Sequence, residues 1–336
     1  MTNPLLTMTG LPPFASIKPE HIVPAVTQAI TDCEAVIANV LANEDTVTWA
    51  NLVAPLEESD DRLGRVWSPI GHLNAVVSSD ELREAHDACL PLLSEYQTKV
   101  GQNQALFLAY QRLHDSSEFA TLSTAQQKVI TNALRDFRLS GIDLQDDDKQ
   151  RYGEITKRLS QLTSTFSNNV MDATLGWQKE ITDEALLIGL PESAKAAAKA
   201  AAESKSLTGY LFTLDFPSYL PVMMYSENRE LRREVYEAFC TRASDVGPNA
   251  GKWDNSAIMD EIIALRHELA ELLGFAHFAE KSLATKMAET PAQVIEFLTD
   301  LADKSVSQAE VELAEIQAFA KGNFMAQTLE AWDLTY

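Results

Sequence analysis

The stretch DDKQRYGEITKRLSQLTSTFSNNV, residues 147–170, decides the fold class. Its apolar residues recur every three or four positions, as they do along one face of an α-helix: Tyr152, Ile155, Leu159, Leu162, Phe166 and Val170. The pattern predicts a helix near residues 147–177, about 45 Å long, which would be a spine of the protein. A coiled-coil seam is the alternative, but Tyr152 and Phe166 are bulky for it and the pattern does not last.

The same spacing predicts helices along most of the remaining chain, beginning near residues 20, 48, 79, 103, 123, 227, 256 and 290. A run of strong helix formers predicts a short helix at 194–204. Ser123 with Gln126 has the form of a capping box, in which two side chains satisfy the first backbone N–H groups of a helix. Thr290 with Gln293 has the same form, and Pro291 between them suits a first helical position.

One stretch breaks the helical spacing. Residues 210–215 alternate with a period of two, residues 216–218 interrupt the pattern with a proline, and an apolar run resumes up to Tyr225. This arrangement predicts a small β-hairpin near 210–225. We therefore expect a mostly α fold, a multi-helical body with one small β-hairpin, divided into a helical region at 1–145 and a second region at 146–336.

The charge of the chain excludes some classes of partner. Its 336 residues carry a formal net charge of −22. Such a chain repels phosphate backbones and anionic lipids, so we expect no nucleic-acid and no membrane partner. Residues 1–6 lack the features of a secretory signal, and no uncharged apolar run is long enough to span a bilayer. The three separate cysteines, Cys33, Cys89 and Cys240, predict buried free thiols in a reducing compartment. With no secretory signal and no membrane span indicated, we expect a cytoplasmic protein.

No complete active site can be assembled from the sequence. His267 and Glu271 share a helix face and could supply two metal ligands, but ion pairs of Glu268 and Glu271 with basic neighbours explain the segment better. The acidic residues Asp143 and Asp146–Asp148 do not have calcium-loop spacing and instead suit the start of the long helix. Phosphate-binding, dinucleotide-binding and hydrolase-elbow motifs do not occur.

Several short sequence motifs, which follow one another in the family's order, resemble those of the thimet oligopeptidase-like zinc metallopeptidases. They are spread from one end of the chain to the other: LPPF at 11–14, IKPEHIVPA at 17–25, PSYLPVM at 217–223, LRHELA at 265–270, LLGF at 272–275, AEKSLATKMA at 279–288 and AWD at 331–333. The resemblance implies a helical body split by a deep channel that admits short peptides. It also implies that this chain is the N-terminal half of a longer enzyme and supplies one wall of the channel.

The family's zinc site, a His-Glu-x-x-His helix with a downstream Glu, lies beyond the segment that is resembled here. The resemblance therefore implies zinc in the full-length enzyme, no zinc in this chain, and no catalytic, cofactor-binding or metal-binding residue within it. His267 and Glu268 correspond to a structural helix of the family. We expect a monomeric cytoplasmic peptidase whose partners are short peptides and whose N-terminal half is inactive alone. A stand-alone helical module that binds peptides or proteins is the alternative.

Overall fold

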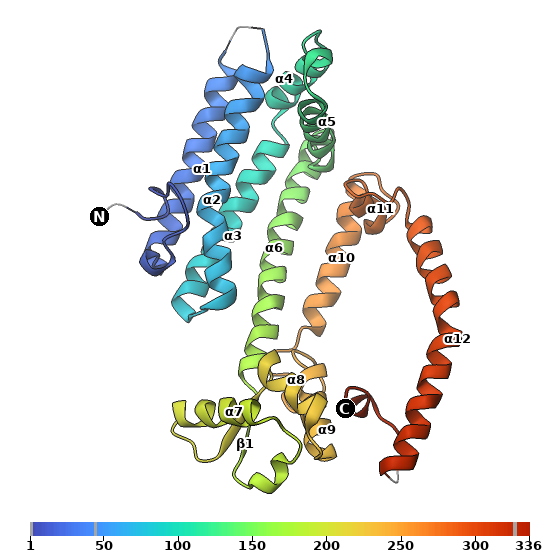
Figure 1. Ribbon diagram of the computed structural model, residues 1–336. Coiled ribbons are helices and arrows are strands. Elements are labelled where there is room, and N and C mark those ends of the chain that lie inside the picture. The colour runs from blue at the N-terminus through green and yellow to red at the C-terminus, as the bar shows by residue number, and fades with distance from the viewer. Residues whose placement is uncertain (1–2, 44–45, 325–327) are drawn as a thin grey trace. The chain divides into compact units, whose positions relative to one another are not determined.

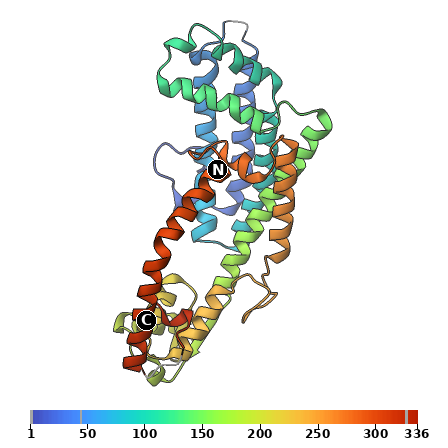
Figure 2. The ribbon, with the colours of Figure 1, turned by 90° about the vertical axis from the view of Figure 1, so that its right-hand side faces the viewer.

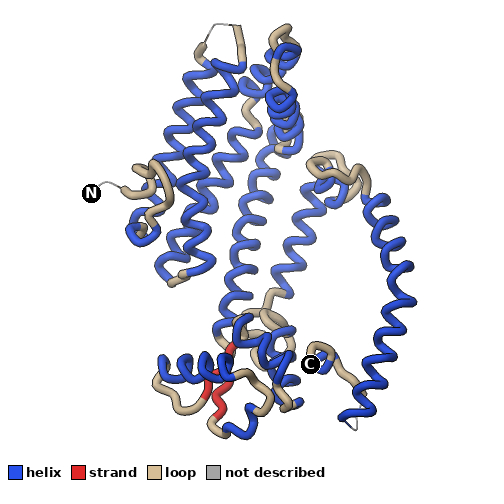
Figure 3. The backbone as a smooth tube through the Cα atoms, viewed as in Figure 1, coloured by secondary structure: helices blue, strands red, loops and turns tan. Residues whose placement is uncertain are grey.

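A computed structural model describes residues 3–43, 46–324 and 328–336. The described chain is mostly α-helical, with one antiparallel pair of short strands (Figure 3). Its helices are α1 Pro19–Leu41, α2 Ala54–Val76, α3 Asp80–Gly101, α4 Gln104–His114, α5 Thr124–Leu139, α6 Asp146–Leu175, α7 Glu192–Ser204, α8 Phe216–Tyr225, α9 Arg229–Cys240, α10 Ser256–Leu272, α11 Phe278–Leu283 and α12 Pro291–Phe324. The strands are β1 Gln178–Ile181 and β2 Tyr210–Thr213. The mostly α fold with one two-stranded element is confirmed.

The chain forms two compact units. The first comprises Met1–Ser164 and Ala264–Lys281, and the second comprises Thr165–Ile263 and Ser282–Tyr336. The boundaries fall inside three helices, so α6, α10 and α11 each contribute to both units.

The first unit is built around three helices that lie side by side, α1, α2 and α3 (Figure 1). Their buried faces share one apolar cluster that includes Ile22, Val26, Val66, Ile70 and Cys89. Helices α4 and α5 lie across one end of these three helices (Figure 2). There the π-helical turn Trp49–Val53 joins the α4 and α5 faces in a second cluster. The segment predicted as one helix from residue 48 is thus a π-helical turn followed by α2.

The long helix α6 confirms the prediction from its apolar spacing. Tyr152, Ile155 and Leu162 are buried, and the first two pack with Leu269 of α10 inside the first unit. Asp146–Asp148 form the first turn of α6, where negative charge is favourable. Burial of its apolar face therefore stabilises α6 along part of its length, and the negative charges of its first turn stabilise its start.

Both predicted capping boxes are present. In α5 the Gln126 N–H donates to Ser123 Oγ at 3.4 Å, and the Ser123 N–H donates to Gln126 Oε1 at 3.0 Å. In α12 the corresponding bonds join Thr290 and Gln293 at 3.2 and 3.4 Å. These bonds satisfy N–H groups that have no partner inside a helix, which explains where the two helices begin.

The second unit packs its small sheet against helices. Strand β1 pairs with β2 in an antiparallel register that sets Gln178 opposite Thr213 and Ile181 opposite Tyr210. Leu211 and Phe212 of β2 are buried, and Phe212 joins a core with Leu187, Val222, Met223 and Val235. This core holds β2, α7, α8 and α9 together.

The predicted hairpin is wrong in its second half. Residues 210–213 form a strand as expected, but their partner is β1, and residues 216–225 form helix α8. Pro217 lies in the first turn of α8, where proline is favourable because the N–H it lacks would have no helical partner. A short apolar run does not distinguish a strand from a buried helix by periodicity.

Two smaller differences concern a cysteine and a helix. Cys33 and Cys89 are buried free thiols as predicted, whereas Cys240 is exposed at the end of α9. Helix α11 was not predicted, because its six residues are too few to show a helical period. Within the described ranges, no helix combines the length and the apolar character needed to cross a membrane.

Candidate functional site

The structure gives the His267 segment a structural role. The His267 Nε2 atom lies 3.4 Å from Glu271 Oε1, and both side chains are exposed. Glu268 instead receives two hydrogen bonds from Arg151 of α6, from Nε at 2.6 Å and from a terminal guanidinium nitrogen at 2.8 Å. The predicted ion pair of Glu268 is therefore present, but its partner, Arg151, comes from another helix. This bidentate pair joins α6 to α10 within the first unit.

No group of three or more His, Cys, Asp or Glu side chains in the described part of the chain is arranged to hold a metal ion. The predicted acidic cluster is spread along a helix start, with Asp146–Asp148 in successive positions of α6 and Asp143 before it. These carboxylates point in different directions around the helix, since successive residues are about 100° apart.

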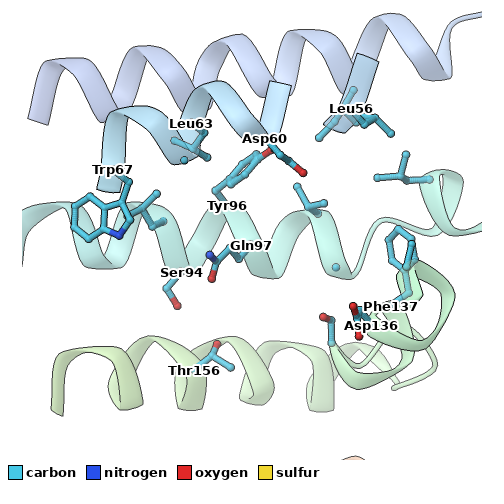
Figure 4. Close-up of a pocket in the computed structure, with 18 of the residues that line it drawn as sticks. Leu56, Asp60, Leu63, Trp67, Ser94, Tyr96, Gln97, Asp136, Phe137 and Thr156 are labelled. Carbon is cyan, nitrogen blue, oxygen red and sulfur yellow. The ribbon is translucent and has the colours of Figure 1, made fainter. Parts of the chain in front are cut away.

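A groove of about 660 Å³ opens in the first unit between α2, α3, α5 and α6 (Figure 4). We call it the acidic groove. Its apolar lining includes the aromatic side chains of Trp67, Tyr96, Tyr110 and Phe137. Phe137 and Tyr110 belong to the second buried cluster and meet edge to face, with ring centres 5.7 Å apart. Well-packed rings at this end give the acidic groove a fixed wall.

Three carboxylates line the acidic groove, and its described lining contains no Lys, Arg or His. Glu57 and Asp60 are one turn apart on α2, so they lie on the same side of that helix. Asp136 of α5 is neutralised by Arg135, whose Nε donates to Asp136 Oδ1 at 2.8 Å. The acidic groove is thus an apolar hollow with net negative charge from α2.

Asp60 and Tyr96 lie beside each other in the acidic groove (Figure 4), where the Tyr96 hydroxyl donates to Asp60 Oδ1 at 3.4 Å. Apolar surroundings raise the pKa of Asp60, although this hydrogen bond acts in the opposite direction. Burial also raises the pKa of Tyr110, and the nearby charges of Glu57 and Asp60 raise it further. The carboxylates therefore act on their surroundings as incompletely screened negative charges.

Ser94 of α3 points into the acidic groove on the side of α6 (Figure 4). The residue is 8% exposed, and its hydroxyl has no hydrogen-bond partner among the described residues. Across the groove, Thr156 of α6 donates to the backbone oxygen of Tyr152 at 3.0 Å. Ser94 therefore presents its hydroxyl to the hollow, whereas Thr156 is hydrogen-bonded within its own helix.

Sequence reasoning missed the acidic groove. Glu57 and Asp60 alternate with Leu56 and Leu63 on one helix face, which is a weak signal of acidic groups next to an apolar surface. The hollow itself depends on how six helices, α1 to α6, converge.

Comparisons with known proteins agree along the chain. The model of the neurolysin/thimet oligopeptidase N-terminal domain matches residues 21–149, and the model of peptidase family M3 matches residues 222–336. The chain is 61% identical over 336 residues to oligopeptidase A of Salmonella typhimurium and to that of Escherichia coli. It is 39% identical over 344 residues to a cytosolic oligopeptidase A homologue of Arabidopsis thaliana.

All of this chain is covered in these three comparisons, but only 48–49% of each relative, so the chain spans about half of their length. A solved structure described as an oligoendopeptidase F of Bacillus anthracis has a similar fold. Its TM-score is 0.57 at 15% identity, over 93% of this chain and 48% of that one.

Proposed function

We propose that this chain is the channel-wall part of a zinc oligopeptidase that cleaves short peptides. The chain belongs to peptidase family M3 and corresponds to the N-terminal half of its oligopeptidase A relatives. The observation that carries the proposal is the 61% identity over all 336 residues. In this proposal residues 1–145 are the N-terminal helical region, and residues 146–336 contribute the long helix and the channel wall.

The described residues of this chain do not fit the zinc that the activity requires. A catalytic zinc site takes three protein ligands and an open position. His267 and Glu271 supply at most two, and both side chains are exposed, with Nε2 and Oε1 3.4 Å apart. We therefore assign zinc, and the polarised carbonyl and activated water that it supplies when bound, to the other half of the full-length enzyme. In this proposal, none of the described residues of this chain carries a step of the hydrolysis.

Helix α12 supports the proposal that a second half covers this chain. Its exposed large apolar side chains are distributed on several sides of the helix: Ile295, Phe297, Leu298, Leu301, Val306, Val311, Leu313, Ile316 and Phe319. Of the side chains described in α12, only Ala320 is buried. A helix that is apolar on several sides is typical of the interior of a larger protein. Relatives twice as long contain a segment that could cover it.

The proposal also covers the setting of the enzyme. It has the full-length protein act as a monomer in the cytoplasm on short peptides, with no nucleic-acid or membrane partner. The net charge of −22 supports only the expectation of no nucleic-acid or membrane partner, since it disfavours contact with phosphate backbones and anionic lipid surfaces.

A chimera tests the proposal. The chain is joined to the second half of Escherichia coli oligopeptidase A, and both the chimera and the isolated chain are incubated with a short fluorogenic peptide. We expect the chimera to cleave the peptide, to lose activity with a chelator and to regain it with zinc, while the isolated chain stays inactive. Chelator-sensitive cleavage by the isolated chain would contradict the proposal. An inactive but folded chimera would instead favour a stand-alone binding module.

A further inference from the structure

We propose that residues 328–336 form a clasp on α9 that fixes the position of α12, and that α12 changes position when the clasp opens. Residues 328–336, α9 and α12 all belong to the second unit. The proposal concerns contacts within that unit, so it does not depend on the peptidase role.

The polar contacts of the clasp converge on two arginines of α9. Arg229 forms a bidentate pair with Asp333, at nitrogen–oxygen distances of 3.0 and 2.6 Å, and donates to the Thr328 backbone oxygen at 2.9 Å. Arg232 donates to Asp333 Oδ1 at 2.8 Å and to the Trp332 backbone oxygen at 3.2 Å. Both side-chain and backbone groups of the clasp are therefore bound by α9.

Aromatic contacts strengthen the clasp. The Trp332 ring packs against the core of the second unit and meets Tyr236 of α9 edge to face, with ring centres 6.1 Å apart. The Arg232 guanidinium lies 4.1 Å from the centre of the Tyr336 ring, where a cation is attracted to the aromatic face. Arg232 is buried, so water competes little for its contacts. The clasp thus combines apolar burial with charged hydrogen bonds that are shielded from water.

Helix α12 has little else in the described chain to fix its position. Of its described side chains only Ala320 is buried, and no other described element packs extensively along it. The clasp, in contrast, lies beside α9 (Figure 1). Because α12 has 34 residues it is about 51 Å long, so a rotation of about 10° about its start moves its far end by about 9 Å.

The covalent chain links the clasp to the far end of α12. Phe324 ends the helix and Thr328 belongs to the clasp, so their Cα atoms lie within about 14 Å of each other by the reach of an extended chain. While the clasp is closed, the end of α12 stays within that reach of α9. Opening the clasp removes this restraint and changes where the exposed apolar side chains of α12 are presented.

Hydrogen exchange measures how often the clasp opens. Backbone bonds such as that from the Asp333 N–H, at 2.9 Å, protect amides of residues 330–334 while the clasp is closed. Arg229→Gln should make these amides exchange at least about tenfold faster, since it removes charged hydrogen bonds to Asp333. Arg233→Gln is the matched control, because Arg233 lies on the same helix and pairs with two glutamates of α9. Equal exchange in the two variants would refute the clasp.

Spin labels measure whether α12 follows the clasp. Ala200→Cys and Gln317→Cys place labels at exposed positions of α7 and α12. Helix α7 shares the core that holds α9, so it serves as the fixed reference. Cys240→Ser removes the exposed thiol, and Cys33 and Cys89 are buried and stay unlabelled. Electron–electron double resonance then gives the distribution of distances between the two labels.

The label distances decide the proposal. We expect one narrow distribution with the clasp intact and with Arg233→Gln, and a second population displaced by several ångströms with Asp333→Asn. Circular dichroism checks that each variant is folded, and if Asp333→Asn is not, Arg229→Gln takes its place as the milder change. Faster exchange in the clasp with an unchanged narrow distribution would show that the clasp does not position α12 and would overturn the proposal.

Discussion

One buried carboxylate, Asp333, ties the last described turn of the chain to α9. Its side chain is 7% exposed and accepts hydrogen bonds from Arg229 at 2.6 Å and from Arg232 at 2.8 Å. Arg232 is buried too, and its other guanidinium nitrogen donates to the backbone oxygen of Ser226 at 2.6 Å. Burial alone would raise the pKa of Asp333, but the bonds from Arg229, from the Glu330 N–H and from Arg232 outweigh it and lower the pKa to about 2.

Asp333→Asn should destabilise the protein by about 3 kcal/mol, because it leaves the buried guanidinium of Arg232 without its counter-charge. Urea unfolding measures the change in the free energy of unfolding. Asp300→Asn is the matched control, since Asp300 forms an exposed pair with Lys304 at 2.7 Å on α12 and such pairs contribute little. A similar small effect of both substitutions would show that the Asp333 cluster is not a stabilising element.

The same carboxylate predicts a pH dependence. Its pKa is lower in the folded chain than its ordinary value of 3.8, so the unfolded chain takes up the proton first as the pH falls. The stability that Asp333 contributes is complete above pH 3.8 and is lost as the pH falls toward about 2. The difference in free energy of unfolding between the unchanged chain and Asp333→Asn should therefore shrink over that interval. A difference independent of pH would contradict a charged Asp333.

Helix boundaries are the feature of single elements that the sequence predicts best. The capping residues Ser123 and Thr290 locate the starts of α5 and α12, because each side chain bonds an N–H of the first turn. The apolar spacing locates α6, because apolar residues that recur every three or four positions over so long a segment indicate a helix. Helix α8 was missed because its ten residues are apolar on most sides and carry no period.

Ser123→Ala should cost about 1 kcal/mol of stability, which is typical of the loss of a helix N-cap. Thr131→Ala is the control in the same helix. Thr131 is exposed in the middle of α5 and bonds the backbone oxygen of Gln127, so alanine there should be neutral or slightly stabilising. Thermal unfolding of the two variants compares them directly. A larger loss at Thr131 than at Ser123 would show that the capping box does not stabilise α5.

The acidic groove could not be predicted from the sequence, because its walls come from segments far apart in the chain. Asp60, Ser94, Phe137 and Thr156 belong to four different helices. Each is unremarkable within its own helix, and the site exists only where those helices meet. The family relationship, in contrast, could be predicted from short sequence motifs. The motif AWD at 331–333 illustrates why. Trp332 packs against the core of the second unit, and Asp333 forms the cluster with Arg229 and Arg232.

The exposed apolar side chains of α12 give the last prediction, at the scale of the whole molecule. If the second half of a full-length enzyme covers this helix, the separately produced second half of Escherichia coli oligopeptidase A should bind the chain. The double variant Leu298→Gln, Leu301→Gln should weaken that association at least about tenfold, since each buried leucine contributes about 1.5–3 kcal/mol. The stability of the chain itself should change little, because both side chains are more than half exposed without the partner.

Analytical ultracentrifugation of labelled chain measures the association. The control Ser307→Gln, Glu310→Gln alters two exposed polar positions of the same helix and should leave the association close to that of the unchanged chain. Hydrogen exchange adds a second measurement, because burial of α12 should slow exchange across residues 294–319 when the second half is present. Association that is unaffected by the leucine changes, together with unchanged exchange in α12, would show that the second half covers another surface and that the apolar character of this helix has a different cause.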